Sequence, residues 1–518
     1  MMRHLQQLAL AAAILGLAPL SAQAQPLPHP AQAATPDEQA LAAELMALLQ
    51  QAGPDPTTVD LARLDDLLAR AERRTPFRGT VQFARVAPLY RLHRMEEAMR
   101  AAEESIELLP GFGLPHLAAF HVALFLDRPI EAGQHLLQGG RISPELLVRT
   151  ESYYVGGLAY RLEGLGEHRL LAALGDMLIA AGWTGTDPAL RSSMARFAVE
   201  EKVERGDLAG ARALVEQLTM PSDVRRLLMQ NAYRPLWNDL DRWAGAGQRR
   251  LWQAHLTDLR NRWAESGDRE AGLAYARGLR EAGLMEAVIR DFLPLFGDGL
   301  DRARDYRLLW AVVDMGHALS QTGRWRELDE VYDRAEAAWP LGSEANAINI
   351  AANRAYFDLQ RGDAETALRR MRAAHSDGER RPGEVGATTT AISFANQICA
   401  LAALGREAEA RELLPRARSG AAGPEVVVGA LLCLDEHDAA RDLLIAGLDD
   451  PARRPQVLSY VQSAPTRPAD SDWGRASFER HRRLAADPLL RAAVARHGRI
   501  LPPTDPGPAP EPVGTAAR

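Results

Sequence analysis

Apolar residues recur at spacings of three and four along almost the whole chain, from about residue 37 to residue 500, and short breaks of Gly, Asp or Pro separate the runs. This spacing places apolar side chains on one face of an α-helix, and the breaks keep each helix short. A helix is expected to begin with Thr35 as N-cap and Pro36 in its first turn, and a second near Asp55. The best β-branched run, residues 426–428, lies in Ala- and Leu-rich helical text. The pattern predicts an all-α fold.

A short motif repeats within this pattern: a Gly or polar turn, one or two charged residues, then a helix that carries Ala. The clearest copies are centred on Gly206, Gly362 and Gly405, and the weaker ones on Gly166, Gly267 and Gly323. Such self-similarity is typical of stacked helix pairs, each too small to bury its own apolar face.

The spacing of other residues supports a repeat. Ala98 and Ala132 lie 34 residues apart, and each precedes a proline by twelve residues, as Leu328 precedes Pro340. The chain therefore resembles the tetratricopeptide repeat, with its helix A, tight turn, Ala in helix B and terminal Pro. The glycines at 206, 267, 323, 362 and 405 are 61, 56, 39 and 43 residues apart, so the repeats are degenerate. We expect a superhelical solenoid of antiparallel helix pairs over residues 37–476, with divergent pairs within 224–244 and 284–296; the alternative is a globular all-α domain.

In tetratricopeptide proteins helix A lines a concave groove, and positions two, six and nine of the repeat point into it. Alignment on Gly267, Gly323, Gly362 and Gly405 at position fifteen gives the candidate groove residues Asp258, Asn261, Asp314, His317, Asn349, Asn353, Tyr356 and Asn396. Asp258, Asp314, Asn353 and Asn396 then share position six. Asn is a poor helix former, and side-chain amides can bond the backbone of an extended peptide. The alternative is that these residues simply solvate a wet face.

The resemblance implies a scaffold that binds a protein or peptide through this groove. A second hypothesis is an accessory factor that binds cell-wall glycan or assists an envelope enzyme. Aromatic residues in the groove favour glycan and amides favour peptide, and Tyr356 and Trp310 leave both open.

Nothing in the sequence indicates catalysis or a cofactor. H-E-x-x-H, G-x-S-x-G, C-x-x-C and dinucleotide-binding glycine patterns are absent, and the only lysine, Lys202, is not in a P-loop. His116 and His121 are five residues apart, which is a poor spacing for a metal pair on a helix. The net charge of −7 gives no electrostatic footprint for nucleic acid. We expect no enzyme activity, no metal and no cofactor, although an active site assembled from distant repeats stays open.

The two ends of the chain carry their own signals. Residues 1–24 read as a signal peptide: Arg3, an apolar core at 8–17 that is too short to span a bilayer, and a small-residue cleavage site before Gln25. Because residue 25 is not Cys, we expect a soluble periplasmic protein and not a lipoprotein. Residues 25–36 are expected to be a linker, 477–500 two capping helices with Asp487 as a cap, and 501–518 a Pro-rich disordered tail.

The only two cysteines, Cys399 and Cys433, are 34 residues apart in apolar helical text. They are either two buried thiols or one bridge between neighbouring repeats. Equivalent helices of adjacent repeats lie about 8–10 Å apart, which favours the thiols unless the side chains converge.

Overall fold

The computed structural model describes residues 36–52, 55–71, 75–148, 150–183, 185, 187–297, 308–381, 385–418, 423–462 and 471–512. In these ranges the regular structure is helical, and the only strand-like pairing is an isolated bridge between Gln230 and Gly498. The predicted all-α fold is confirmed, and the β-branched run lies inside a helix, Pro424–Cys433. The first helix begins at Pro36, as expected. The expected signal peptide, and the expected linker up to residue 35, lie outside the described residues.

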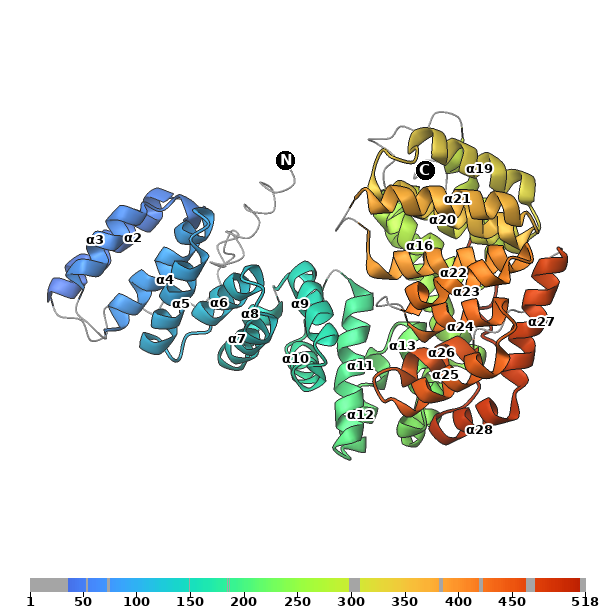
Figure 1. Cartoon of the computed structure of the whole chain (residues 1–518). Helices are drawn as coiled ribbons and strands as arrows, with labels where there is room; N and C mark the ends of the chain where they lie inside the picture. Colours follow the sequence, from blue (N-terminus) through green and yellow to red (C-terminus); the bar gives the residue numbers. More distant parts are fainter. Residues whose placement is uncertain are drawn as a thin grey trace. The chain divides into compact units, whose positions relative to one another are not determined.

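The chain divides into two compact units, with the boundary between Thr219 and Met220 (Figure 1). The helices of the first unit are α2 (Pro36–Ala52), α3 (Leu61–Arg70), α4 (Pro76–Arg91), α5 (Met95–Leu108), α6 (Leu114–Phe125), α7 (Pro129–Ile142), α8 (Glu145–Val148), α9 (Ser152–Gly164), α10 (His168–Ala180), α11 (Pro188–Glu204) and α12 (Leu208–Ala213), with 3₁₀ turns η2 (Pro56–Thr58) and η3 (Val215–Gln217). The helix expected near Asp55 therefore begins at Leu61, where the Asp60 side chain accepts the Ala62 N–H as N-cap.

The second unit begins with the shorter elements α13 (Pro221–Met229), η4 (Asn231–Leu236), α14 (Trp237–Ala244) and η5 (Ala246–Gln248). Its longer helices are α15 (Arg249–Ser266), α16 (Arg269–Glu281), α17 (Met285–Phe292) with η6 (Leu293–Phe296), α18 (Leu308–Gln321), α19 (Trp325–Ala338), α20 (Ala345–Gln360), α21 (Ala364–Glu379), α22 (Ala387–Ala403), α23 (Glu407–Arg418), α24 (Pro424–Cys433), α25 (His437–Asp449), α26 (Arg454–Gln462), α27 (Asp472–Ala486) and α28 (Pro488–His497).

One turn joins the two helices of each pair. A residue with positive φ ends the first helix, its N–H bonds the carbonyl three residues back, and the next N–H bonds the carbonyl five residues back, as in a Schellman motif. In the described chain this turn occurs at His93, Asp127, Gly166, Gly206, Gly283, Gly323, Gly362, Gly405 and Asp435, and the same two bonds also form at Gly182, between α10 and α11. Five of the six glycines singled out in the sequence therefore mark true pair turns, which confirms the helix-pair organisation.

Gly267 is the exception. Its N–H bonds Trp263 O, four residues back, and the Asp268 N–H bonds the Ser266 side chain instead of closing the second bond. This is a simple left-handed helix end between α15 and α16. α16 contacts both α15 and α17, but it is joined to α17 by the shared turn, at Gly283, and it is α16 that contacts α18 of the next pair, so we number this repeat from Gly283 instead of Gly267.

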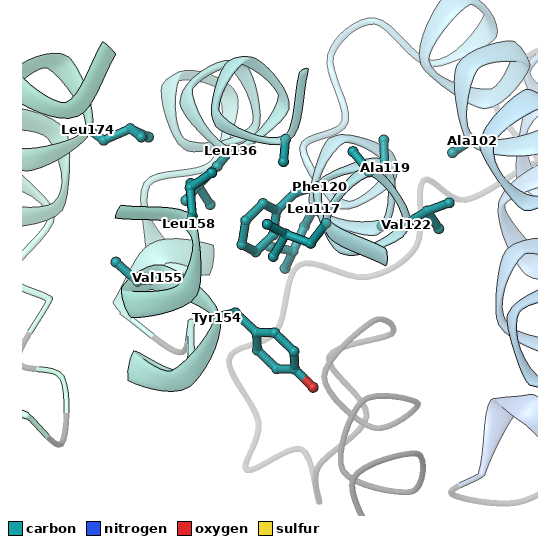
Figure 2. Close-up of a cluster of buried hydrophobic side chains, with 14 of the residues drawn as sticks. Ala102, Leu117, Ala119, Phe120, Val122, Leu136, Tyr154, Val155, Leu158 and Leu174 are labelled. Carbon is teal, nitrogen blue, oxygen red and sulfur yellow. The ribbon is translucent and has the colours of Figure 1, made fainter. Parts of the chain in front are cut away.

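The cores consist of apolar side chains shared between neighbouring pairs. Figure 2 shows one such cluster in the first unit, where Leu117 and Phe120 of α6 lie close to Leu136 of α7 and Leu158 of α9. The repeat anchors Ala98 and Ala132 are both fully buried. Small residues at these positions allow the paired helices to approach closely, which explains why they recur with the repeat.

The last two helices pack within the second unit. Ser471 caps α27 by accepting the Gly474 N–H, and its hydroxyl donates to Gln360 O at 2.6 Å, so α27 lies beside the turn at Gly362. Asp487 caps α28 as expected, since it accepts the N–H groups of Leu489 and Leu490. α27 begins at Asp472, five residues before the predicted start at 477, and contacts α20, α24 and α25.

The residues after α28 differ from the expected disordered tail over their described part, 501–512. This segment forms no helix and lies against α15 and α17 of the same unit, where arginine side chains bond its backbone carbonyls. The remainder of the expected tail, residues 513–518, lies outside the described residues.

Cys399 on α22 and Cys433 on α24 form a disulfide, with a Cα–Cα distance of 5.0 Å, so the preference for two thiols is corrected. Helix axes about 8–10 Å apart leave facing Cα atoms much closer, because each Cα lies about 2.3 Å from its own axis. α22 and α24 are in direct contact, and Cys399 Sγ lies 3.8 Å from the carbonyl oxygen of Gly429 on the facing helix.

Candidate functional site

The first helices of successive pairs in the second unit form a continuous row, which we call the first-helix row: α16, α18, α20, α22 and α24. Each of these helices packs against the next one. The second helices of neighbouring pairs, in the described residues, make only marginal contact with each other. Helices that converge on one side and diverge on the other place the first-helix row on the inner side of the stack. Of the helices that carry predicted groove residues, α18, α20 and α22 belong to this row and α15 does not.

Three predicted residues lie on one stripe of α20. Asn349, Asn353 and Tyr356 are each half-buried and follow one another at intervals of four and three residues. Asn353 Nδ2 donates to Asn349 O at 2.7 Å, and Gln360 Nε2 donates to the Tyr356 hydroxyl at 2.9 Å. The Asn353 carbonyl oxygen and the Asn349 amide remain available in the described structure for another partner.

Asn396 occupies the corresponding place on α22. It is half-buried and has no side-chain hydrogen bond to any described residue. A half-buried amide without a partner in its own chain is a good acceptor and donor for a ligand backbone. Of the position-six residues on the first-helix row, Asn353 and Asn396 therefore retain unused hydrogen-bonding groups.

Asp314 on α18 has a different role. It is 5% exposed and accepts from Arg280 Nε of α16 at 2.5 Å. This ion pair joins two consecutive members of the first-helix row, so the carboxylate is engaged within the protein.

His317, one turn further along α18, is brought against Tyr356, with ring centroids 6.2 Å apart, and against Phe357 in an edge-to-face contact at 5.2 Å. Burial, and then the nearby Arg280, lower the pKa of His317 to about 4. The ring is therefore neutral at pH 7 and packs as an aromatic group. Trp310 on the same helix is the more exposed aromatic, at 37%.

Asp258 and Asn261 lie on α15, outside the first-helix row, because the turn that aligned them is not a pair turn. Both are exposed; Asp258 pairs with Arg262, and Asn261 Oδ1 accepts from Arg260 at 3.1 Å. The position-six slot of the α16–α17 pair, counted from Gly283, is Ala274. The structure therefore does not bring Asp258 and Asn261 together with the other candidates.

A network of charges that the sequence analysis missed lies on the opposite side of α20. Arg354 is 6% exposed and donates to Glu336 at 2.5 Å and to Asp333 at 2.7 Å on α19. Arg370 of α21 reaches the same Glu336 at 3.1 Å. These bonds hold α19, α20 and α21 together and keep the stripe of α20 in a fixed orientation. No local sequence motif predicts these ion pairs, because the partners come from different helices.

A small hollow lies between α20, α21 and α22. Ile348, Ala352 and Val385 form its apolar wall, and Thr389, Thr390 and Ser393 contribute hydroxyl groups. Ile348 and Ala352 directly precede Asn349 and Asn353 in the sequence, so the hollow lies near the stripe of amides. His375, Glu379 and Arg381 also line it.

The described residues contain no cluster of three or more His, Cys, Asp or Glu side chains placed to bind a metal ion. None of the described helices combines the length and the apolar character that a membrane crossing requires.

The helix pairs and their shared turn define the class of the chain: an all-α protein of tetratricopeptide-like helix pairs. No protein-family model matches it, and no curated protein sequence matches it. Solved structures similar to it include a chain of the crystal structure of the APC/C hetero-tetramer Cut9–Hcn1, with 13% identity, a TM-score of 0.29, and coverage of 86% of this chain and 94% of that one. Another is a chain of the structure of Naa15/Naa10 bound to HypK-THB, with 13% identity, a TM-score of 0.24, and coverage of 89% and 79%. At these scores neither likeness supports an argument about function.

Proposed function

We propose that this protein is an exported scaffold that binds an extended segment of a partner protein along α18, α20 and α22. The observation that carries the proposal is the stripe of half-buried amides, Asn349, Asn353 and Asn396, on the inner side of the stack. Amides pair with both the N–H and the C=O groups of an extended backbone, which suits recognition of a peptide. The adjoining hollow then holds one side chain of the partner.

The test is to select peptides against the whole protein from a random library and to measure the affinity of a selected peptide for variants. Replacing Asn349, Asn353 and Asn396 together by Ala should weaken binding by one to three decades, since each lost hydrogen bond costs about 0.5–1.5 kcal/mol. The same change should leave the free energy of unfolding unchanged or slightly higher, because Ala is the better helix former.

The matched control is Asn238→Ala, which removes an exposed amide on α14, outside the first-helix row. It should bind the selected peptide as the wild type does. If the triple variant is folded and also binds normally, the amides only solvate this face and the proposal fails. If the triple variant unfolds, these amides satisfy buried groups between the helices and are structural.

Export to the periplasm is the second part of the proposal. It rests on the signal-like residues 1–24 and is supported by the bond between Cys399 and Cys433, because disulfides persist in oxidising compartments. N-terminal sequencing of the protein recovered from the periplasm should begin at or near Gln25. Recovery of the intact chain from the cytoplasm, beginning at Met1 or Met2, would contradict it.

A further inference from the structure

Residues 501–512, which we call the tail, lie on the surface of α15 and α17. Arg260 of α15 donates from Nε to Glu511 O at 2.7 Å and from its terminal nitrogen to Pro512 O at 3.3 Å. Arg290 of α17 donates to Pro510 O at 2.9 Å. Two arginines from two helices thus hold three consecutive backbone carbonyls.

One of these arginines is also held by contacts that do not involve the tail. Arg290 makes two bonds to the fully buried carboxylate of Asp291, at 2.9 and 2.8 Å, and its hydrogen bonds to Asp291 raise the pKa of Arg290. The guanidinium is therefore oriented by the protein interior, and the terminal nitrogen that bonds Asp291 also donates to the carbonyl of Pro510. A group held in its binding orientation loses little freedom when the ligand binds.

The other end of the tail is held by charge and close contact. Asp505 pairs with Arg249 at the start of α15, and the Asp505 N–H donates to Gly247 O at 2.8 Å. Gly507 has a φ of +71°, and a Cβ there would collide with the amide nitrogen of Gln253. Ala509 packs against the apolar cluster of the helices beneath. Arg249, Gln253, Arg260 and Arg290 form what we call the tail surface.

The tail offers mainly hydrogen-bond acceptors, and the tail surface offers mainly donors. Six of the eleven residues from 502 to 512 are prolines, which lack an N–H and favour extended backbone. Arginine offers donors and no acceptor. The carbonyl groups of a proline-rich segment can therefore accept from these arginines, and the segment has few N–H groups that would need an acceptor on this surface.

The tail also buries few of its side chains. Every residue from Leu501 to Pro512 is half-buried or exposed, in contrast to the buried side chains of the helices beneath. Every residue type has a backbone carbonyl, so these hydrogen bonds do not require the particular side chains of the tail. A comparable segment from another chain could make the same bonds.

We propose that the tail surface is a second binding site, for an extended, proline-rich segment with an acidic residue about five positions before the held carbonyls, and that the tail is its internal occupant. A partner with such a segment binds by displacing the tail. Because a tethered ligand has an effective concentration in the millimolar range, free segments compete poorly until the tail is released. This site shares no residue with the amides of α20 and α22. A test of this site is therefore independent of a test of the proposed function.

The test uses the full chain and a labelled synthetic peptide of residues 501–512, LPPTDPGPAPEP. In the variant D505R/A509R the tail is repelled by Arg249 and loses its apolar contact, while the tail surface is unchanged. This variant should bind the peptide at least tenfold more tightly than the wild type. Adding Arg260→Ala should weaken that binding at least tenfold, whereas adding Arg262→Ala, which removes a neighbouring arginine paired with Asp258, should not change it.

Arg290 is left in place because it neutralises the buried Asp291. A second measurement needs no substitution: a large excess of the peptide should remove the hydrogen-exchange protection of the Asp505 amide in the wild-type chain. The proposal is overturned if folded D505R/A509R does not bind the peptide, or if Arg260→Ala and Arg262→Ala behave alike. It is also overturned if excess peptide leaves the Asp505 amide protected, because the tail is then a permanent part of the fold.

Discussion

Replacing Cys399 and Cys433 together by Ala should lower the free energy of unfolding of the second unit by about 4 kcal/mol. The bond closes a loop of 34 residues, and the chain-entropy relation assigns roughly that stabilisation to a loop of this length. Cys399 is buried and both residues lie in one apolar cluster, so the Ala variant loses little hydrophobic contact beyond the bond itself. The effect should appear in chemical unfolding of the whole protein.

Reduction provides an independent check on this prediction. A strong reductant should destabilise the wild type by a similar amount and leave the C399A/C433A variant unchanged, which separates loss of the bond from loss of the sulfur atoms. A wild-type protein that is equally stable with and without reductant would show that the bond contributes nothing, and reactive thiols in the unfolded, unreduced protein would show that it is absent.

The helix pairs could be predicted from the sequence because their turns have a strict backbone requirement. A residue with positive φ must end the first helix, and Gly adopts that conformation without cost. Gly166, Gly206, Gly323, Gly362 and Gly405 were found for this reason. The same turn at His93, Asp127 and Asp435 was missed, because a non-glycine residue at positive φ is held there by the packing of the pair and leaves no sequence signal. The turn at Gly283 was missed although it carries a glycine.

The error at Gly267 had the opposite cause. A left-handed glycine ends many helices, and the turn at Gly267 lacks the second hydrogen bond that the pair turns share. A sequence shows the glycine and not the bond. Asp258 and Asn261 were therefore placed in a slot that belongs to α16, and the groove prediction is retained only for α18, α20 and α22.

A single sequence does not show which of the candidate groove residues are engaged within the protein and which keep unbonded polar groups. Asp314 and Asn353 occupy equivalent positions, yet Asp314 is engaged by Arg280 from the preceding pair, while Asn353 keeps an unbonded carbonyl oxygen. Arg280 is 34 residues from Asp314, and no local pattern links them. Position in the repeat predicts which face a residue lies on; its availability for a ligand depends on partners that only the folded structure brings close.

Acid should destabilise the first unit well before its carboxylates are protonated, because that unit holds neutral histidines in its core. His121 on α6 is 2% exposed and lies between Phe120 and Tyr154, with ring centroids 4.7 and 4.6 Å away, and burial lowers its pKa to about 3. His116 lies 3.2 Å from His135 between their Nδ1 atoms, and burial, followed by His135, lowers the pKa of His116 to about 4. Both residues are uncharged in the folded protein at neutral pH.

The direction of the effect follows from proton binding. Between pH 6.5 and about 4 the unfolded chain protonates these histidines and the folded protein does not, so the unfolded state binds more protons and the free energy of unfolding falls as the pH falls. At pH 5 each histidine should cost about 2 kcal/mol relative to pH 7.5, or about 4 kcal/mol for the two. His121→Leu should remove about half of this loss, and it should not destabilise the protein at pH 7.5, because the Nδ1 of His121 has no partner among the described atoms.

Hydrogen exchange of the α6 and α9 amides at pH 7.5 and pH 5, corrected for the intrinsic pH dependence of exchange, measures this loss within the first unit. The control is His168→Gln, which changes an exposed histidine on α10 and should keep the wild-type difference between the two pH values. Equal protection at pH 7.5 and pH 5 in the wild type would mean that the core accepts the protonated rings. An unchanged pH difference in His121→Leu would assign the acid sensitivity to His116 and His135 instead of to the buried ring.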